Sequence, residues 1–410
     1  MDIPRLRFKG INGVEFPEWE SKKLSEICDV RDGTHDSPKF VANGYPLVTS
    51  KNISNGKVSL DNTQMISEAD YYFINKRSKV DKNDILMSMI GTIGNFAFVN
   101  NDAKYAIKNV ALIKDIGFAI SLFIFYFISN PSFILKQQKE IVGGTQKFVA
   151  LNKIRNFTIS LPCIPEQQKI ADFLSSYDEK ISIQRERVEA LERRKKGLLQ
   201  KVFSQEIRFK AEDGGIYEKW ESKTIGDVTV PTAGATPSTK NGSYWIGGDI
   251  PWMSSGEVHN GQVFKTEKFI TAKGYSNSST KLLPPNTVVV ALAGQGKTRG
   301  SVAITRIKLC TNQSLAGLVL KEGSNVTCDY LYQYLKNQYS ELRKVSSGDG
   351  GRGGLNLNII SEFPIILPSL KEQRKIADFF TVIDDQINIE KERLSTMETI
   401  KKGLLQGLFC

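Results

Sequence analysis

The chain carries one 43-residue stretch twice. Residues 161–203 read LPCIPEQQKIADFLSSYDEKISIQRERVEALERRKKGLLQKVF, and residues 367–409 read LPSLKEQRKIADFFTVIDDQINIEKERLSTMETIKKGLLQGLF. The two copies align at a constant offset of 206 without a gap, and 22 of the 43 positions are identical. This spacing is too long for a solenoid repeat and indicates a duplicated unit of one domain followed by one segment. The predicted order is therefore domain, segment, domain, segment.

Both copies have the apolar pattern of a long coiled-coil helix. Apolar residues recur in alternating steps of four and three, as at the a and d positions of a heptad. The polar residues that interrupt this seam, Gln184 and Lys195 in the first copy and Glu390 and Lys401 in the second, fall at equivalent places. The residues expected to pair the helices are Ile170, Leu174, Ile181, Val188, Leu191, Ile376, Phe380, Ile387, Leu394 and Leu404.

The two helices are predicted to pair with each other as an antiparallel spacer. If the domains sit at opposite ends, the first helix runs from domain one to domain two and the second must return. Some 38 residues at ~1.5 Å each make a rod of roughly 57 Å. Start signals are present, because Pro165 precedes Glu166 and Ser369 with Glu372 has the form of a capping box. Two unrelated exposed helices are the alternative, which the matched seams disfavour.

The duplication extends into the domains. FPEWESKKLSEIC around Trp19 resembles YEKWESKTIGDVT around Trp220, and further pairs of segments match at similar offsets. Short β-branched runs alternate with Asn-Gly, Gly-Gly and Pro turn signals, and one apolar helix is expected near 120–139 with a counterpart near 330–345. The sequence thus predicts α+β domains at 1–160 and 204–366, with helices at 161–203 and 367–410.

The positive charge of the chain lies in the domains. The net charge is +11, of which residues 166–203 carry +2 and residues 372–410 carry −1, leaving +10 elsewhere. An acidic partner such as nucleic acid follows as a hypothesis, and a merely basic soluble protein is the alternative.

No catalytic or metal-binding constellation stands out. The five cysteines have no metal-ligand spacing, which favours reduced thiols in the cytoplasm, and there are only two histidines. Residues 291–298 fit a loose phosphate-binding loop, but a strand-like run follows Lys297 where that motif needs a helix. The N-terminus lacks the apolar core of a signal peptide, and the apolar run at 118–128 is too short to span a bilayer. We therefore expect a cytoplasmic protein without membrane contact.

Polar, glycine-rich loops recur at the same places in both domains. Their Asn, Gln, Ser, Thr, Lys and Arg side chains can bind phosphates and the edges of bases. The loop sequences differ while the framework matches, as expected of two readers with different targets, although ordinary drift of surface loops would also produce this difference. The residues predicted to contact DNA are Thr34, His35, Lys51, Asn52, Thr92, Thr145, Gln146, Lys147, Thr236, Ser238, Ser254, Ser255, Lys297, Arg299 and Arg352.

These motifs resemble the specificity subunit of type I restriction–modification enzymes. The most specific marks are Leu161-Pro162 with Glu166-Gln167 and Leu367-Pro368 with Glu372-Gln373, which occur in duplicate. The resemblance implies two target recognition domains that each read half of a split double-stranded DNA sequence, on a helical ruler that docks two methyltransferase (M) subunits. A motor–nuclease (R) subunit can join them. It also implies that this chain binds no cofactor, since S-adenosylmethionine, ATP and magnesium would belong to the partners.

Two hypotheses from other classes remain. A DNA-bridging protein without sequence specificity would share the two basic domains and the rod, and would bind with a steep salt dependence. The second hypothesis is an enzyme, an ATPase that depends on Lys297. The sequence does not reveal the bases recognised.

Overall fold

The computed structural model describes residues 4–91, 94–141, 149–294, 296–346 and 354–409. The chain divides into two compact units. Unit 1 comprises Met1–Glu186 and Lys391–Cys410, and unit 2 comprises Arg187–Glu390. Each unit therefore holds one duplicated domain together with half of each long helix.

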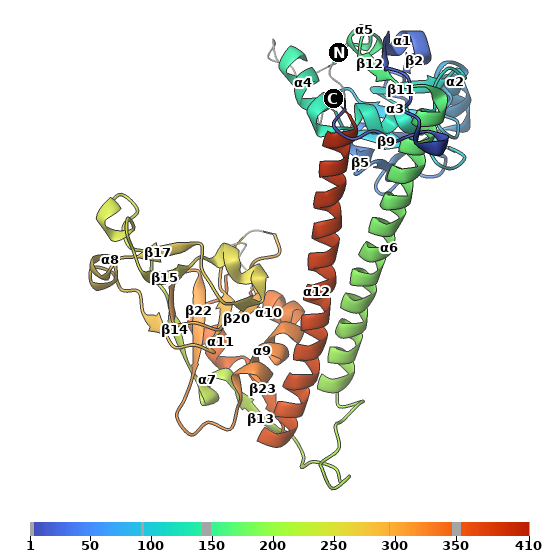
Figure 1. Ribbon diagram of the computed structural model, residues 1–410. Coiled ribbons are helices and arrows are strands. Elements are labelled where there is room, and N and C mark those ends of the chain that lie inside the picture. The colour runs from blue at the N-terminus through green and yellow to red at the C-terminus, as the bar shows by residue number, and fades with distance from the viewer. Residues whose placement is uncertain (1–3, 92–93, 142–148, 295, 347–353, 410) are drawn as a thin grey trace. The chain divides into compact units, whose positions relative to one another are not determined.

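Unit 1 consists of short strands and few helices (Figure 1). Its strands are β1 (Glu20–Lys23), β2 (Cys28–Asp32), β3 (Phe40–Val41), β4 (Tyr45–Val48), β5 (Ile53–Ser54), β6 (Lys57–Val58), β7 (Gln64–Ile66), β8 (Ile85–Ser88), β9 (Phe96–Phe98), β10 (Ala106–Ile107), β11 (Val110–Asp115) and β12 (Thr158–Leu161). Its helices are η1 (Ile11–Gly13), α1 (Leu24–Ile27), η2 (Ser50–Asn52), α2 (Glu68–Ser78), α3 (Ser121–Ile128), α4 (Pro131–Ile141), α5 (Leu151–Arg155) and the first part of α6 (Ile164–Phe203).

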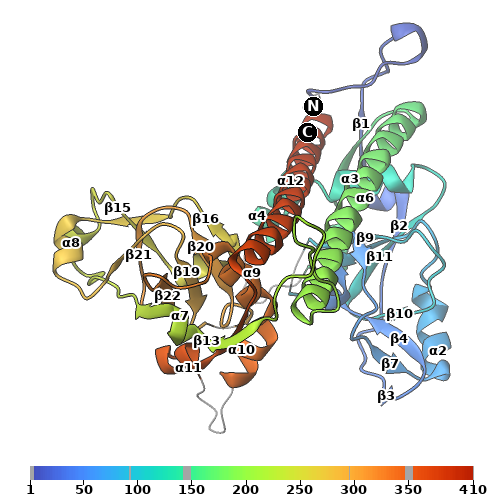
Figure 2. The same cartoon turned by 90° about the horizontal axis from the view of Figure 1, so that it is seen from below.

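Two four-stranded sheets form the centre of unit 1. One has the order β2-β11-β8-β9 and is antiparallel throughout. The other has the order β10-β4-β7-β3, with β10 parallel to β4, and α2 lies beside it (Figure 2). Strand β8 is apolar along nearly its whole length because both of its faces are covered: Ile85 and Met87 join one core and Leu86 joins another.

Unit 2 repeats this plan. Its strands are β13 (Glu221–Thr224), β14 (Thr229–Ala233), β15 (Ile250–Met253), β16 (Gln262–Val263), β17 (Lys268–Ile270), β18 (Leu282–Leu283), β19 (Val288–Ala291), β20 (Val302–Thr305), β21 (Leu309–Thr311), β22 (Leu315–Leu320) and β23 (Pro364–Leu367). Its helices are α7 (Ile225–Val228), η3 (Gly242–Tyr244), η4 (Ser255–Asn260), α8 (Ala272–Ser276), α9 (Cys328–Asn337), α10 (Tyr339–Val345), α11 (Leu357–Glu362) and the first part of α12 (Leu370–Leu408).

Most strands in the sheets of unit 2 correspond to strands of unit 1, but β18 pairs with β21, whereas β3 of unit 1 lies at the other edge of its sheet beside β7. The order β14-β22-β19-β20 matches β2-β11-β8-β9, with β16 added at the edge, and β17-β15-β21-β18 again contains a parallel pair, β15 with β21. Val288 and Val290 of β19 join one core while Val289 joins another, as the equivalent residues of β8 do. The predicted α+β class with two pseudo-symmetric domains is confirmed.

The single apolar helix expected near 120–139 is in fact two helices, α3 and α4, and the counterpart near 330–345 is also two, α9 and α10. In unit 1 the break falls before Pro131, which has no N–H to continue the helix. The buried side chain of Asn130 accepts a hydrogen bond from the N–H of Ser132 at 3.1 Å, so it caps the next helix.

The repeated Glu-Gln pair at the start of each long helix connects it to its domain. In unit 1 the buried carboxylate of Glu166 accepts hydrogen bonds from Arg7 Nη2 at 2.7 Å and from the Trp19 indole at 3.1 Å. Next to it, the Gln167 side chain accepts from the N–H of Ile120 at 2.9 Å and donates to the carbonyl of Pro162 at 2.8 Å. The helix thereby binds the N-terminal segment, the first tryptophan and the loop before α3 at one place.

Unit 2 has the same arrangement. Glu372 accepts from Arg208 at 2.7 Å and from Trp220 at 2.9 Å, while Gln373 accepts from the N–H of Thr327 at 2.9 Å. Half of the predicted capping box is present, because the Ser369 hydroxyl accepts a hydrogen bond from the N–H of Glu372 at 3.5 Å. The Glu372 carboxylate is engaged by the arginine and the tryptophan, and does not close back on the cap residue.

In unit 1 the first half of α6 and the second half of α12 are antiparallel. Lys401 forms an ion pair with Asp178, and Arg185 forms one with Glu398 at 2.6 Å. As α6 runs from residue 178 to residue 185, its ion-pair partners on α12 run backwards from residue 401 to residue 398, so the two helices point in opposite directions. Lys401, which breaks the apolar seam in the sequence, is accommodated because the facing helix supplies a carboxylate.

In unit 2 the second half of α6 and the first half of α12 follow the same rule. Lys195 pairs with Asp384 at 2.5 Å, and Arg187 pairs with Glu390 at 2.9 Å. Of the residues predicted to pair the helices, seven are buried: Ile170, Leu174, Ile181, Val188, Ile376, Phe380 and Ile387. The other three are partly buried: Leu191, Leu394 and Leu404. The predicted antiparallel pairing of two long helices is confirmed within each unit.

The start of the chain lies against the end of α12 within unit 1. The N–H of Leu6 donates to the carbonyl of Gly407 at 2.8 Å. The equivalent bond in unit 2 runs from Ile207 to Lys201 at 3.1 Å, where the chain is continuous. Both domains therefore begin in the same way on the end of a long helix. Among the described helices, none is both long enough and apolar enough to cross a lipid bilayer.

Candidate nucleic-acid interface

In unit 1 the polar loops converge on a two-residue turn, Lys108–Asn109, between β10 and β11. The N–H of Asn109 donates to the carbonyl of Thr34 at 3.1 Å, and the hydroxyl of Ser50 donates to the carbonyl of Asn109 at 3.3 Å. The loop after β2 crosses this turn so closely that a Cβ on Gly33 would lie 2.3 Å from the Ile107 carbonyl oxygen. The loops after β2 and β4 are therefore fastened to each other through this turn.

His35 is held on both ring nitrogens. Nδ1 lies 2.8 Å from Asn109 Oδ1, and Nε2 lies 2.8 Å from Asp32 Oδ2. Because an amide oxygen and a carboxylate only accept, both nitrogens carry protons in this arrangement. The hydrogen bond to Asn109 and that to Asp32 raise the pKa of His35, against the nearby charge of Arg77. When His35 is protonated, the loop presents a positive charge at the edge of the sheet.

The loop after β4 is preformed by its own side chains. Asn52 Oδ1 accepts hydrogen bonds from the N–H of Thr49 at 2.9 Å and from its hydroxyl at 3.0 Å. Asn52 therefore shapes the turn η2 with its amide oxygen, while Lys51 beside it is exposed. In unit 2 Glu257 does the same for Ser254, accepting from its N–H at 2.8 Å.

Unit 2 has an equivalent meeting point at residues 312–314, between β21 and β22. Gln313 Oε1 accepts from the Thr236 hydroxyl at 2.5 Å, and the Asn312 amide donates to the Ser255 hydroxyl at 3.4 Å. The carbonyl of Ser314 accepts from the N–H of Leu292, which leads into the next loop. A Cβ on Gly234 would lie 2.2 Å from the Thr311 carbonyl oxygen, so this glycine serves the same close crossing as in unit 1.

The glycine-rich turn between β19 and β20 is braced from α10. Arg343 Nη1 donates to the carbonyl of Gly296 at 2.6 Å, and the Tyr339 hydroxyl donates to the carbonyl of Lys297 at 2.9 Å. Gly296 has a φ of 63° and Gly300 a φ of 81°, which suit residues without a side chain. Lys297 is exposed at the tip of the turn, and a strand follows it, as the sequence predicted.

The structure brings together several of the residues predicted to contact DNA. Thr34, His35, Lys51 and Asn52 gather around the turn at 108–109, and Thr236, Ser254 and Ser255 around the turn at 312–314. Ser238 is exposed on the loop after β14, and its carbonyl accepts from Trp245. Arg299 is partly buried beside Lys297. Five predicted residues lie outside the described part of the chain: Thr92, Thr145, Gln146, Lys147 and Arg352.

The sequence analysis missed the two turns at which the loops meet. Lys108, Asn109 and residues 312–314 join buried strands, and they carry no glycine-rich signal. One signal was available: in each domain an Asn stands between two strands of the duplicated pattern. Only the parallel pairing of β10 with β4 and of β21 with β15 brings that residue next to the other loops.

Comparison with known proteins identifies the family. The sequence profile of the type I restriction modification DNA specificity domain matches the chain twice, over residues 17–193 and 217–399. The chain is 25% identical over 420 residues to a putative type I restriction enzyme MjaX specificity subunit of Methanocaldococcus jannaschii, covering 98% of this chain and 95% of that protein. The MjaIX specificity subunit of the same organism is 34% identical over 212 residues, 50% of this chain and 48% of that protein.

Solved structures share the fold. The S subunit of a type I restriction-modification system from M. genitalium has a TM-score of 0.60 at 16% identity, covering 99% of both chains. A chain from a study of the assembly and conformational transition of a type I R-M system has a TM-score of 0.57 at 19% identity, covering 96% of this chain and 98% of that one. Because the family profile matches most of the sequence, this protein belongs to the type I restriction–modification DNA specificity family, whose members recognise DNA and are not themselves catalytic.

Proposed function

We propose that each unit reads one half of a bipartite double-stranded DNA target through its own set of loops. The observation that carries this proposal is that two different loop sets stand on one repeated framework. In unit 1 the loops meet at Asn109 and carry His35 and Lys51, whereas in unit 2 they meet at residues 312–314 and carry Thr236 and Gly256 at the equivalent positions. Different side chains at equivalent positions would read different bases. Nonspecific bridging requires no such difference, and nothing in the comparisons favours it.

The two long helices act as the ruler between the half-sites. Helix α6 continues without a break for 40 residues and α12 for 39, so each is about 60 Å long. A pseudo-twofold reader of this kind suits half-sites on the order of one helical turn of DNA apart. The unread gap would then follow from the number of helical residues.

Two methyltransferase subunits would bind to the helices at equivalent places. Ile183 on α6 and Ile389 on α12 are related by the offset of 206, and both are exposed, at 59% and 52%. What supports a contact here is that both copies of the duplicated helix keep an exposed isoleucine at the same position. Duplicate contact points fit two copies of one partner, to which motor–nuclease subunits could be added. S-adenosylmethionine, ATP and magnesium would belong to those cytoplasmic partners, and this chain would position the extruded base without acting on it.

The test is a map of modified adenines. We would express the chain with the methyltransferase subunit of its own system in a host without adenine methylation, and sequence the modified genome. We expect a split motif with two short specific parts around a fixed gap. A variant with four residues deleted from α6, about 6 Å of helix, should change the gap and keep both specific parts. Methylation at a continuous site would contradict the two-reader proposal, and a changed half-site would contradict the ruler.

A further inference from the structure

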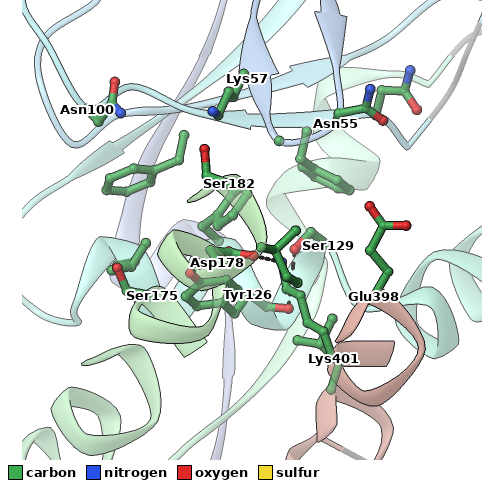
Figure 3. Close-up of a pocket in the computed structure, with 18 of the residues that line it drawn as sticks. Asn55, Lys57, Asn100, Tyr126, Ser129, Ser175, Asp178, Ser182, Glu398 and Lys401 are labelled. Carbon is green, nitrogen blue, oxygen red and sulfur yellow. Dashed lines mark hydrogen bonds and ion pairs between the residues drawn. The ribbon is translucent and has the colours of Figure 1, made fainter. Parts of the chain in front are cut away.

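Unit 1 contains a cavity of about 540 Å³ between its domain and the two long helices. Figure 3 shows Asn55, Lys57 and Asn100 on the side of the strands, and Asp178 and Lys401 on the side of the helices. The floor between them is partly aromatic, from α3 and β9. None of the residues predicted to contact DNA lines the cavity, although Asn55 and Gly94 lie within three residues of Asn52 and Thr92 in sequence.

The duplication shows which side chains belong at these positions in unit 2. The register of β8 with β9 and of β19 with β20 makes Asn100 equivalent to Arg306. Arg306 donates to Gln262 at 2.8 Å and forms an ion pair with Asp329 at 2.6 Å. The alignment of α3 with α9 makes Ser129 equivalent to Lys336. In unit 2, two long cationic side chains therefore occupy positions that hold short side chains in unit 1.

The equivalent carboxylates Asp384 on α12 and Asp178 on α6 show which hydrogen-bond donor unit 1 lacks. In unit 2, Asp384 accepts from Lys195 at 2.5 Å, Gln333 at 2.9 Å and Lys336 at 3.4 Å. Despite its burial, the pKa of Asp384 is lowered by the charges of Lys336 and Lys195. Asp178, its equivalent, accepts from Tyr126 at 2.8 Å and from Lys401.

Of the two aspartates, the one with fewer hydrogen-bond donors is the more exposed. The side chain of Asp178 is 37% exposed, against 13% for Asp384. An ionised carboxylate has about four acceptor positions, so Asp178 has room for a further donor. Ser129, at the cavity wall, is too short to supply the ammonium that Lys336 supplies in unit 2.

We propose that the cavity of unit 1 receives a basic side chain of the methyltransferase subunit that binds the helices there, with Asp178 as its acceptor. The other helical carboxylate of the cavity, Glu398, is already paired with Arg185 at 2.6 Å, so Asp178 is the acceptor with room for a further donor. A cation is favoured because the same position in unit 2 holds one on the equivalent carboxylate. Ile183 and Ile400 are exposed apolar residues on the same two helix segments that line the cavity, so a partner could pack on these segments beside it.

This inference rests on the proposed function, and its first test is the substitution Ser129→Lys. That change would supply the missing ammonium from within the chain and fill the cavity. We expect stepwise binding of the purified methyltransferase subunit, followed by native mass spectrometry and calorimetry, to show one of the two sites weakened at least tenfold and the other unchanged. Ser132→Lys, which adds the same charge at an exposed position on α4, is the matched control and should leave both sites unchanged.

A second measurement keeps the proposal testable should Ser129→Lys disturb folding. A photoreactive phenylalanine analogue at position 129 should cross-link, in the assembled complex, to a methyltransferase peptide whose attached segment contains a lysine or arginine. A cross-link to DNA or to an acidic segment would overturn the proposal, as would the absence of any cross-link to the methyltransferase subunit. Two unweakened sites in a folded Ser129→Lys chain would overturn it as well, with the proposed function intact. If the unaltered chain bound no methyltransferase subunit, both would fall.

Discussion

Units 1 and 2 share the hydrogen bonds that join each domain to its long helix, and they differ in their loops and in the residues around Ser129 and Lys336. Glu166 and Glu372 have the same arginine and tryptophan partners at nearly the same distances. By contrast, the equivalent residues Ser129 and Lys336 leave a cavity in one unit and an ion pair in the other. The two copies thus kept the contacts that join each domain to its helix, while the loops and the position of Ser129 and Lys336 diverged. Predictions follow from each side of this contrast.

The largest effect is expected from breaking the shared framework. Glu166→Ala leaves a guanidinium and a buried indole N–H without their acceptor, and Glu372→Ala does the same in the other unit. Removing one partner of a buried ion pair costs about 3 kcal/mol or more of unfolding free energy. We expect similar losses in both units, measured by urea unfolding of the full chain with hydrogen exchange to assign each unit.

Exposed glutamates near the two tryptophans provide the controls for this experiment. Glu18→Ala and Glu218→Ala remove carboxylates that face solvent, and they should change stability by no more than about 0.5 kcal/mol. Strongly unequal losses for the Glu166 and Glu372 variants would contradict the view that the two frameworks are energetically equivalent.

An intermediate effect is expected in the braced turn of unit 2. Arg343→Met removes the donor to the Gly296 carbonyl and frees the turn that carries Lys297. A lost charge-assisted hydrogen bond is worth about 1.5 kcal/mol, so discrimination at the half-site of unit 2 should fall roughly tenfold. Methylation rates on targets mutated in one half-site at a time would measure this.

The other half-site is the internal reference for Arg343→Met, and it should be read as before. Lys344→Met on the same helix removes a solvent-exposed ion pair with Glu341 and should leave both half-sites unchanged. Equal loss at both half-sites would mean that the turn affects overall binding and not the reading of one unit.

The smallest effect is the pH dependence of unit 1. The folded protein raises the pKa of His35 above its ordinary value of about 6.5, through Asn109 and then Asp32. A raised folded-state pKa stabilises the fold fully below the unfolded pKa, and this contribution is lost as pH rises through the folded pKa. His35→Gln should therefore lower the urea midpoint of unit 1 slightly more at pH 5.5 than at pH 9. An equal or larger loss at pH 9 would exclude the protonated arrangement.

Much of the fold could be predicted because its signals are local or periodic. The heptad steps of 161–203 and 367–409 required two long helices, and their repetition required two domains of one kind. The rejection of a phosphate-binding loop at Lys297 also rested on a local pattern, the strand that follows. The sequence prediction missed the division of the apolar helix at Pro131. Its signal was local, because a proline inside an apolar run interrupts a helix.

The functional surfaces could be predicted only as far as loops. Sequence patterns pointed to Thr34, His35 and Lys51, but gave no indication that Asn109, about 75 residues later, fastens them. The same holds for Asp178, whose partners Tyr126 and Lys401 lie 52 and 223 residues away. Such contacts depend on strand pairing and helix register, which leave no period in the sequence.

The sequence by itself determined that this chain is a duplicated α+β protein on a paired helical rod, because heptads and repeats are written along one dimension. Only the tertiary structure decided that Glu166 and Glu372 hold an arginine and a tryptophan, that the loops meet at Asn109 and at residues 312–314, and that Ser129 lines a cavity where its equivalent Lys336 forms an ion pair. The physical reason is that burial and charge pairing act between side chains brought close in space, whatever their distance along the chain.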